Sequence, residues 1–182
     1  PELNDARLRK LDKATPLVDG EPGKAAIRNG LNVGVDLQGV GSKGLVGYRA
    51  LKFADVRDVE KRGHDKREFW EPIYASKSGR LILHPNEFYS LASKERLQVP
   101  PEYAAEMIPI DPMMGEFRDN DAGFFDPGFG YAAEGGGGSK AVLEVRTLEI
   151  PFVLEHGQTI ARLVYEDLAE RFRSARQGIP PT

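Results

Sequence analysis

Cysteine is absent from the 182 residues of this chain, which excludes disulfide bonds and metal sites with thiolate ligands. The three histidines, His64, His84 and His156, stand in unlike contexts, and no two have the spacing of helical metal ligands. No apolar run approaches the roughly 18 residues that span a bilayer, and no signal-peptide pattern opens the chain. We therefore expect a soluble, cytoplasmic protein that binds no membrane and has no zinc or other metal site of its own.

The charges nearly cancel, because 25 Lys and Arg residues stand against 28 Asp and Glu residues, a net charge of −3. No global field attracts nucleic acid, so an anionic ligand must be held by a local cluster of positive groups. The nucleophile elbow Gly-x-Ser-x-Gly, the phosphate-binding loop and the dinucleotide fingerprint are also missing. With 40% hydrophobic residues the chain can form a real core, and its length suits one domain.

The chain divides into three parts. Residues 1–29 are polar and interrupted by proline and glycine, which predicts an N-terminal arm or linker with at most a turn or two of helix. Residues 30–167 contain many short apolar segments separated by turn signals, the pattern of an all-β barrel or sandwich with few short helices. Residues 168–182 form a C-terminal tail. Within the domain, the charged stretch 55–68 predicts a solvated loop or short helix, and residues 102–106 a turn or short helix.

The most informative segment is residues 122–130, in which three glycines and a proline surround the carboxylate of Asp126. Asp126, Pro127, Gly128 and Phe129 predict a β-turn of type I or II, because proline sets φ at its second position. Such a turn can present a carboxylate, backbone N–H groups and an aromatic ring to one small ligand. A nucleobase, which needs stacking and hydrogen bonds at its edge, suits that set of groups.

A second carboxylate, Glu144, lies in the middle of the predicted strand 141–145. Strand geometry places it on one face with Val142 and Arg146. If that face lines a pocket, Val142 desolvates the carboxylate while Arg146 holds it ionised, and the group suits proton transfer. If the face meets water, the segment is an ordinary hairpin with a weak surface ion pair. The pattern leaves both interpretations open.

Residues 122–129 together with 141–145 resemble the core signature of the dCTP deaminases, members of the dUTPase-like superfamily. Residues 34–37, 83–92 and 157–166 resemble further strands of that family in the same order. More narrowly, the chain resembles one lobe of the long bacterial dCTP deaminases, whose chains carry two such lobes in tandem. The resemblance implies a distorted β-barrel of the dUTPase-like type.

The resemblance also implies hydrolytic deamination of dCTP to dUTP and ammonia, with water activated by a glutamate instead of zinc. The lack of cysteine agrees independently, because zinc-dependent nucleobase deaminases need cysteine ligands. Glu144 stands at the position of the general base, and Arg118 is the one residue of its segment suited to the catalytic and phosphate contacts. Mg²⁺ is expected to accompany the triphosphate. The resemblance further implies a homo-oligomer whose active sites lie between subunits. The residues that match substrate-binding positions are Ala122, Gly123, Asp126, Phe129 and Gln158.

Residues 113–121 depart from the family pattern, because they lack its serine-rich stretch and include Asp119, Asn120 and Asp121. Two carboxylates beside a triphosphate repel it unless Mg²⁺ intervenes. Two alternatives therefore stand beside the deaminase: a non-catalytic lobe that binds nucleotide or pairs with a subunit, and a dUTP diphosphatase on the same fold.

Overall fold

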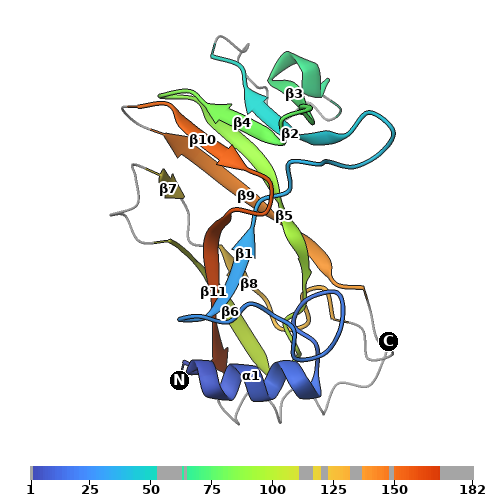
Figure 1. Cartoon of the computed structure of the whole chain (residues 1–182), viewed down its shortest axis with the longest axis vertical. Helices are drawn as coiled ribbons and strands as arrows, with labels where there is room; N and C mark the ends of the chain where they lie inside the picture. Colours follow the sequence, from blue (N-terminus) through green and yellow to red (C-terminus); the bar gives the residue numbers. More distant parts are fainter. Residues whose placement is uncertain are drawn as a thin grey trace.

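A computed structural model describes residues 2–52, 63, 65–110, 117–119, 123–131, 137–147 and 150–168. Three antiparallel sheets surround one core, with the strand orders β1-β11-β6-β8, β10-β4 and β3-β2-β5-β9-β7 (Figure 1). The predicted all-β class is confirmed, and the helices of the described ranges are α1 (Asp5–Ala14) and the 3₁₀ turn η1 (Lys66–Glu68). The strands are β1 (Leu31–Gly34), β2 (Leu45–Ala50), β3 (Trp70–Tyr74), β4 (Arg80–Leu83), β5 (Phe88–Leu97), β6 (Tyr103–Pro109), β7 (Phe117–Asp119), β8 (Phe124–Phe125), β9 (Ser139–Thr147), β10 (Phe152–Glu155) and β11 (Thr159–Asp167).

The two long strands β5 and β9 pair along the middle of the molecule (Figure 1). Their inward residues alternate with outward ones, so that Leu91 and Leu143 are buried in the core. The pairing shifts between Ala92 and Arg96, where β5 carries extra residues. The hydroxyl of Ser93 fills this bulge: it accepts the Ala141 N–H at 2.8 Å and donates to the Glu95 carbonyl at 2.7 Å.

The N-terminal segment, expected as an arm or linker, packs closely against the barrel. Helix α1 begins at the N-cap Asn4, whose side chain accepts the Arg7 N–H at 3.0 Å, and it buries Leu8 completely. The carboxylate of Asp12, only 1% exposed, accepts the N–H groups of Leu17 and Ala25 at 2.9 and 3.1 Å. Residues 2–29 therefore contribute to the core, which local composition did not indicate.

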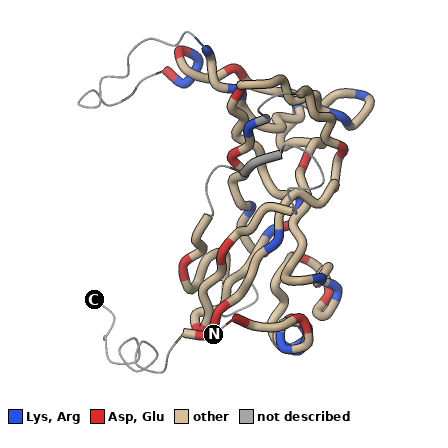
Figure 2. The backbone as a smooth tube through the Cα atoms, turned by 90° about the vertical axis from the view of Figure 1, so that its left-hand side faces the viewer, with Lys and Arg blue, Asp and Glu red and all other residues tan. Residues whose placement is uncertain are grey.

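One further expectation about the elements is corrected. Residues 102–106, predicted as a turn or short helix, lie largely in β6, because pairing with β11 and β8 outweighs their local helix propensity. Of the charged stretch 55–68, most lies outside the described residues, but residues 66–68 form the short helix η1. Acidic and basic residues are both scattered along the described backbone (Figure 2).

Candidate active site

Glu144 projects from the outer face of the five-stranded sheet. The neighbouring inward residues of β9 are buried, whereas Glu144 is exposed and Val142 is 65% exposed. Strand register places Glu144 opposite Ser90, Ser90 opposite Tyr48, and Tyr48 opposite Pro72. One row of side chains thus crosses four strands on the outer face, with the carboxylate at its β9 end. Of the two interpretations left open by the sequence, this single chain has the face open to solvent.

Arg146, on the same face as Glu144, contacts an aromatic ring. Its guanidinium carbon lies 5.8 Å from the centroid of Phe88, whose ring centroid is 6.0 Å from that of Trp70. This distance is within the range of a cation–π contact. No ion pair joins Arg146 to Glu144 among the side chains that the structure describes, so the Glu144 carboxylate is available for another partner.

A small cavity lies next to Ser90, the residue of β5 that stands opposite Glu144. It has a volume of about 170 Å³ and is lined by Tyr48, Lys66, Trp70 and Ser90. Because Ser90 stands directly opposite Glu144, this cavity borders the outer-face row that ends at the carboxylate. The sequence analysis missed the cavity, since its lining residues come from three strands and a turn that are distant along the chain.

The other predicted catalytic residue, Arg118, lies in β7, of which the structure describes the backbone. Its position pairs with that of Arg146, two residues beyond Glu144 along β9. The backbone pairing therefore brings the two predicted catalytic positions to neighbouring strands. Ala122, predicted to read the base, lies outside the described residues, as do the positions 113–116 and 120–121 of the divergent segment.

The predicted turn around Asp126 is confirmed, and its type is II. The Phe129 N–H donates to the Asp126 carbonyl at 3.0 Å, and Gly128 has φ +91°, the left-handed value that a type II turn requires at its third residue. The Asp126 side chain is exposed, whereas Phe129 packs edge-on against the buried Phe125 at 4.9 Å. Gly123 lies just before β8, where its carbonyl accepts the Met107 N–H at 2.8 Å.

The turn and Glu144 lie apart within one chain. Val99 exchanges backbone hydrogen bonds with Gly128 and Phe129, and this contact lies beyond the end of the β5–β9 ladder at Ser139. From Ser139 to Glu144 the strand advances about 17 Å, at about 3.4 Å per residue. The structure therefore does not gather the predicted base and the predicted deoxyribose-binding carboxylate into one pocket of a single chain.

Gln158, predicted to bind substrate, closes the turn between β10 and β11. Its side-chain oxygen accepts the Glu155 N–H at 2.9 Å, and its carbonyl accepts the Val35 N–H at 3.1 Å. The predicted turn at residues 156–158 is confirmed. In this chain the amide oxygen of Gln158 already has a structural partner, so its role toward a substrate stays a prediction.

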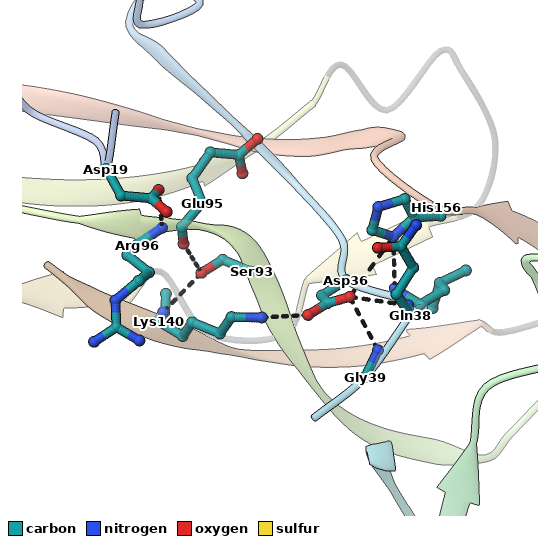
Figure 3. A network of polar contacts seen from close by, with 11 residues as sticks. Asp19, Asp36, Gln38, Gly39, Ser93, Glu95, Arg96, Lys140 and His156 are labelled. Carbon is teal, nitrogen blue, oxygen red and sulfur yellow. Dashed lines mark hydrogen bonds and ion pairs between the residues drawn. The ribbon is translucent and has the colours of Figure 1, made fainter. Parts of the chain in front are cut away.

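A polar network beside this turn was not singled out from the sequence. Asp36, 7% exposed, forms an ion pair with Lys140 and accepts the N–H groups of Gln38 and Gly39 at 2.9 and 3.1 Å (Figure 3). The Nδ1 atom of His156 also lies near this carboxylate, 3.6 Å from Oδ1 of Asp36. The sequence signal that could have indicated this network is the single aspartate within the apolar strand segment 34–37.

The pKa of Asp36 shows that this carboxylate stays ionised. Burial by itself would raise the pKa, but the hydrogen bond from the Lys140 ammonium and those from two backbone amides outweigh it. The net pKa lies below the ordinary value of 3.8. The network thus joins the end of β1 to the start of β9, the strand that carries Glu144.

No group of three or more His, Cys, Asp or Glu side chains in the described ranges is placed to hold a metal ion. Among the helices of those same ranges, none has the length and apolar character needed to cross a membrane.

Comparison with known proteins places this geometry in a family. Residues 4–177 match the model of the 2′-deoxycytidine 5′-triphosphate deaminase (DCD), C-terminal domain. The crystal structure of 2′-deoxycytidine 5′-triphosphate deaminase from Agrobacterium tumefaciens superimposes with a TM-score of 0.83 and 51% sequence identity, covering 91% of this chain and 48% of that chain. A curated protein of Methanobrevibacter smithii named "dCTP deaminase, dUMP-forming" is 29% identical over 119 residues, which is 64% of this chain and 55% of that protein.

The chain therefore spans about half the length of each of these two relatives. The match to the family model covers nearly all of it, from the N-terminal helix to the segment beyond β11. The chain belongs to the family of the 2′-deoxycytidine 5′-triphosphate deaminase C-terminal domain.

Proposed function

We propose that this chain carries the deaminating site of a dCTP deaminase, which hydrolyses dCTP to dUTP and ammonia. The observation that carries the proposal is the position of Glu144: a carboxylate in the centre of β9, on an open face, in a chain of this family. It has no ion-pair partner among the described side chains, so it is free to accept a proton from water.

The chemistry needs one group that takes a proton and returns it. Glu144 removes a proton from a water molecule, and the resulting hydroxide adds to C4 of the cytosine ring. The carboxylic acid passes that proton to N3 of the ring. The carboxylate then carries the proton of the new C4 hydroxyl to the exocyclic amine, which leaves as ammonia as the C4 carbonyl of uracil forms. Arg118 is proposed to contact phosphate and help position the water, because its backbone pairs with Arg146, two residues beyond Glu144 on β9.

The substrate is proposed to bind where the turn of one chain meets the Glu144 face of another. Asp126 would accept the hydroxyl of the deoxyribose, and Phe129 would pack against the nucleoside. The backbone of Ala122 and Gly123 would read the edge of the base, with Gln158 nearby. Mg²⁺ enters as part of the substrate, bound to the triphosphate whose charge it neutralises.

A homo-oligomer is part of the proposal. Within one chain the turn lies beyond the Ser139 end of β9 while Glu144 is near the middle of that strand, which supports a site completed by a second copy. Two exposed apolar side chains support association: Val142 on the Glu144 face, and Phe124, which is 73% exposed beside the turn.

A second possible product of the reaction is dUMP. The Methanobrevibacter smithii relative is named dUMP-forming, which favours testing dUMP beside dUTP. Loss of diphosphate requires a water placed at the α-phosphate in addition to the one at C4. The exposed carboxylate of Asp126 is the residue of the turn that suits this second role.

The decisive experiment measures ammonia release from dCTP with Mg²⁺ and separates the nucleotides by chromatography. Glu144→Gln should lower turnover by at least about 100-fold, because the amide cannot accept the proton, while dCTP affinity changes little. Glu166→Gln, at an exposed glutamate of β11, serves as the matched control and should keep full turnover. Unchanged turnover in Glu144→Gln would refute the assignment of the base. Binding without turnover in the parent protein would favour the non-catalytic lobe, and turnover of dUTP alone the diphosphatase.

A further inference from the structure

A groove of about 510 Å³ lies over β2 and β3, away from the turn around Asp126. Its floor is the outer face of these two strands. Trp70, Pro72 and Tyr74 alternate onto that face along β3, and Tyr48 stands opposite Pro72 on β2. Tyr74 is 48% exposed, so the floor offers an accessible aromatic surface rather than a sealed core.

Three cations, Lys43, Lys66 and Arg67, and one carboxylate, Asp65, also line the groove. Lys43 lies in the tight turn that joins Val40 to Leu45, where the two residues exchange backbone hydrogen bonds at 2.9 Å. Lys66 begins the 3₁₀ turn η1 before β3. In the part of the chain that the structure describes, neither lysine forms an ion pair, whereas the adjacent Arg67 is paired with Asp65 at 2.7 Å.

We propose that this groove binds a nucleotide, with the base stacked on the aromatic floor and the phosphate held by Lys43 and Lys66. Aromatic side chains stack on any base through its π-face, and lysines supply point charges for phosphate. An uncharged apolar ligand would leave both ammonium groups unused. The volume lies within the range of small-molecule sites, about 300–1,000 Å³.

The groove lies beside the candidate active site. It shares Tyr48, Lys66 and Trp70 with the small cavity next to Ser90, but it does not include the predicted catalytic and substrate-binding carboxylates. Tyr48 and Glu144 lie on strands separated by β5, so their backbones are about 10 Å apart. Neither Glu144 nor Asp126 lines the groove. The proposal therefore does not rest on the deaminase reaction, and nucleotide binding here can be tested in a protein that turns over no dCTP.

Trp70 is the one tryptophan of the sequence and lines the groove, so its fluorescence responds to a ligand bound there. The test is a titration of the purified protein with ADP while tryptophan fluorescence is recorded. We expect a saturable change, with adenosine binding more weakly than ADP because it lacks the phosphates. The absence of a saturable change, or equal affinities for ADP and adenosine, would overturn the proposal.

Variants then locate the site. The double variant Lys43→Ala, Lys66→Ala should weaken ADP binding by at least about tenfold, because two phosphate contacts are lost. Lys24→Ala, at an exposed lysine outside the groove, is the matched control and should bind as the parent does. Equal affinity in the double variant and the Lys24 control would contradict the groove site.

Discussion

Substitution of Asp36 tests whether its polar network holds the end of β1 to the start of β9. One carboxylate oxygen accepts the N–H groups of Gln38 and Gly39, and the other is paired with Lys140. Asp36→Asn keeps an oxygen for the two amides but loses the ion pair. Asp36→Ala loses every one of these contacts.

The expected cost follows from these contacts. A hydrogen bond to a charged group contributes about 1.5–3 kcal/mol, and a partly exposed partner puts the value at the lower end. Because the Lys140 side chain is 26% exposed, Asp36→Asn should lower the free energy of unfolding by about 1.5 kcal/mol. Asp36→Ala also leaves two backbone N–H groups without an acceptor, which adds about 2 kcal/mol.

The assay is urea unfolding at several pH values. The pKa of Asp36 is lower in the folded protein than its ordinary value of 3.8, so the folded state favours the ionised form. The stability it contributes is fully present well above pH 3.8 and is lost as the pH falls through the folded pKa. The difference in unfolding free energy between parent and Asp36→Asn should therefore be constant near neutrality and shrink below about pH 4.

Glu21→Gln is the control, because this carboxylate is exposed and its substitution should change stability by less than about 0.5 kcal/mol. The reasoning is refuted if Asp36→Asn is as stable as the parent at pH 7. It is also refuted if the difference between the two proteins grows as the solution is acidified.

Three further predictions concern the turn, the N-terminal segment and the association surface. Gly130→Ala should lower the free energy of unfolding by about 3 kcal/mol, since φ is +62° and a Cβ would lie 2.2 Å from the Leu97 carbonyl oxygen. Gly128→Ala, which has open space around it, should lower it by only about 1 kcal/mol. Equal shifts in the melting temperature of the two variants would contradict this. Asp12→Ala should lower the free energy of unfolding measured in urea by about 2 kcal/mol, because the N–H groups of Leu17 and Ala25 lose their acceptor. No change in stability would instead indicate that the N-terminal segment is a loose arm. Val142→Lys should lower the mass measured by sedimentation and reduce dCTP turnover, with an unchanged monomer fold.

The control for the last variant is Val153→Lys, at a valine that is 48% exposed on β10 and away from the Glu144 face. It should leave both the sedimenting mass and the turnover as in the parent. Identical masses for parent and Val142→Lys would remove this surface from the proposed interface.

Local chemistry made much of the site predictable. Alternation of apolar residues marked β9 and put Glu144 on a face with Val142 and Arg146, as the structure has it. Proline before glycine predicted the turn after Asp126, because those two residue types suit the φ values of a type II turn. Each of these signals depends on neighbours within a few residues, so no long-range contact was needed to recognise it.

Other features depend on contacts between distant segments. Residues 102–106 became strand because β11 and β8 pair with them, and Leu8 became core because α1 docks on the barrel. The groove brings Lys43, Lys66 and the β3 aromatics together from three segments.

The sequence by itself determined the all-β class, the turn and the two carboxylates, since these follow from residue type and short-range periodicity. Only the tertiary structure decided which face of β9 is open, and that the turn around Asp126 lies beyond the Ser139 end of that strand, apart from Glu144. Strand pairing and register set those relations, and they join residues through long-range hydrogen bonds that no local pattern encodes.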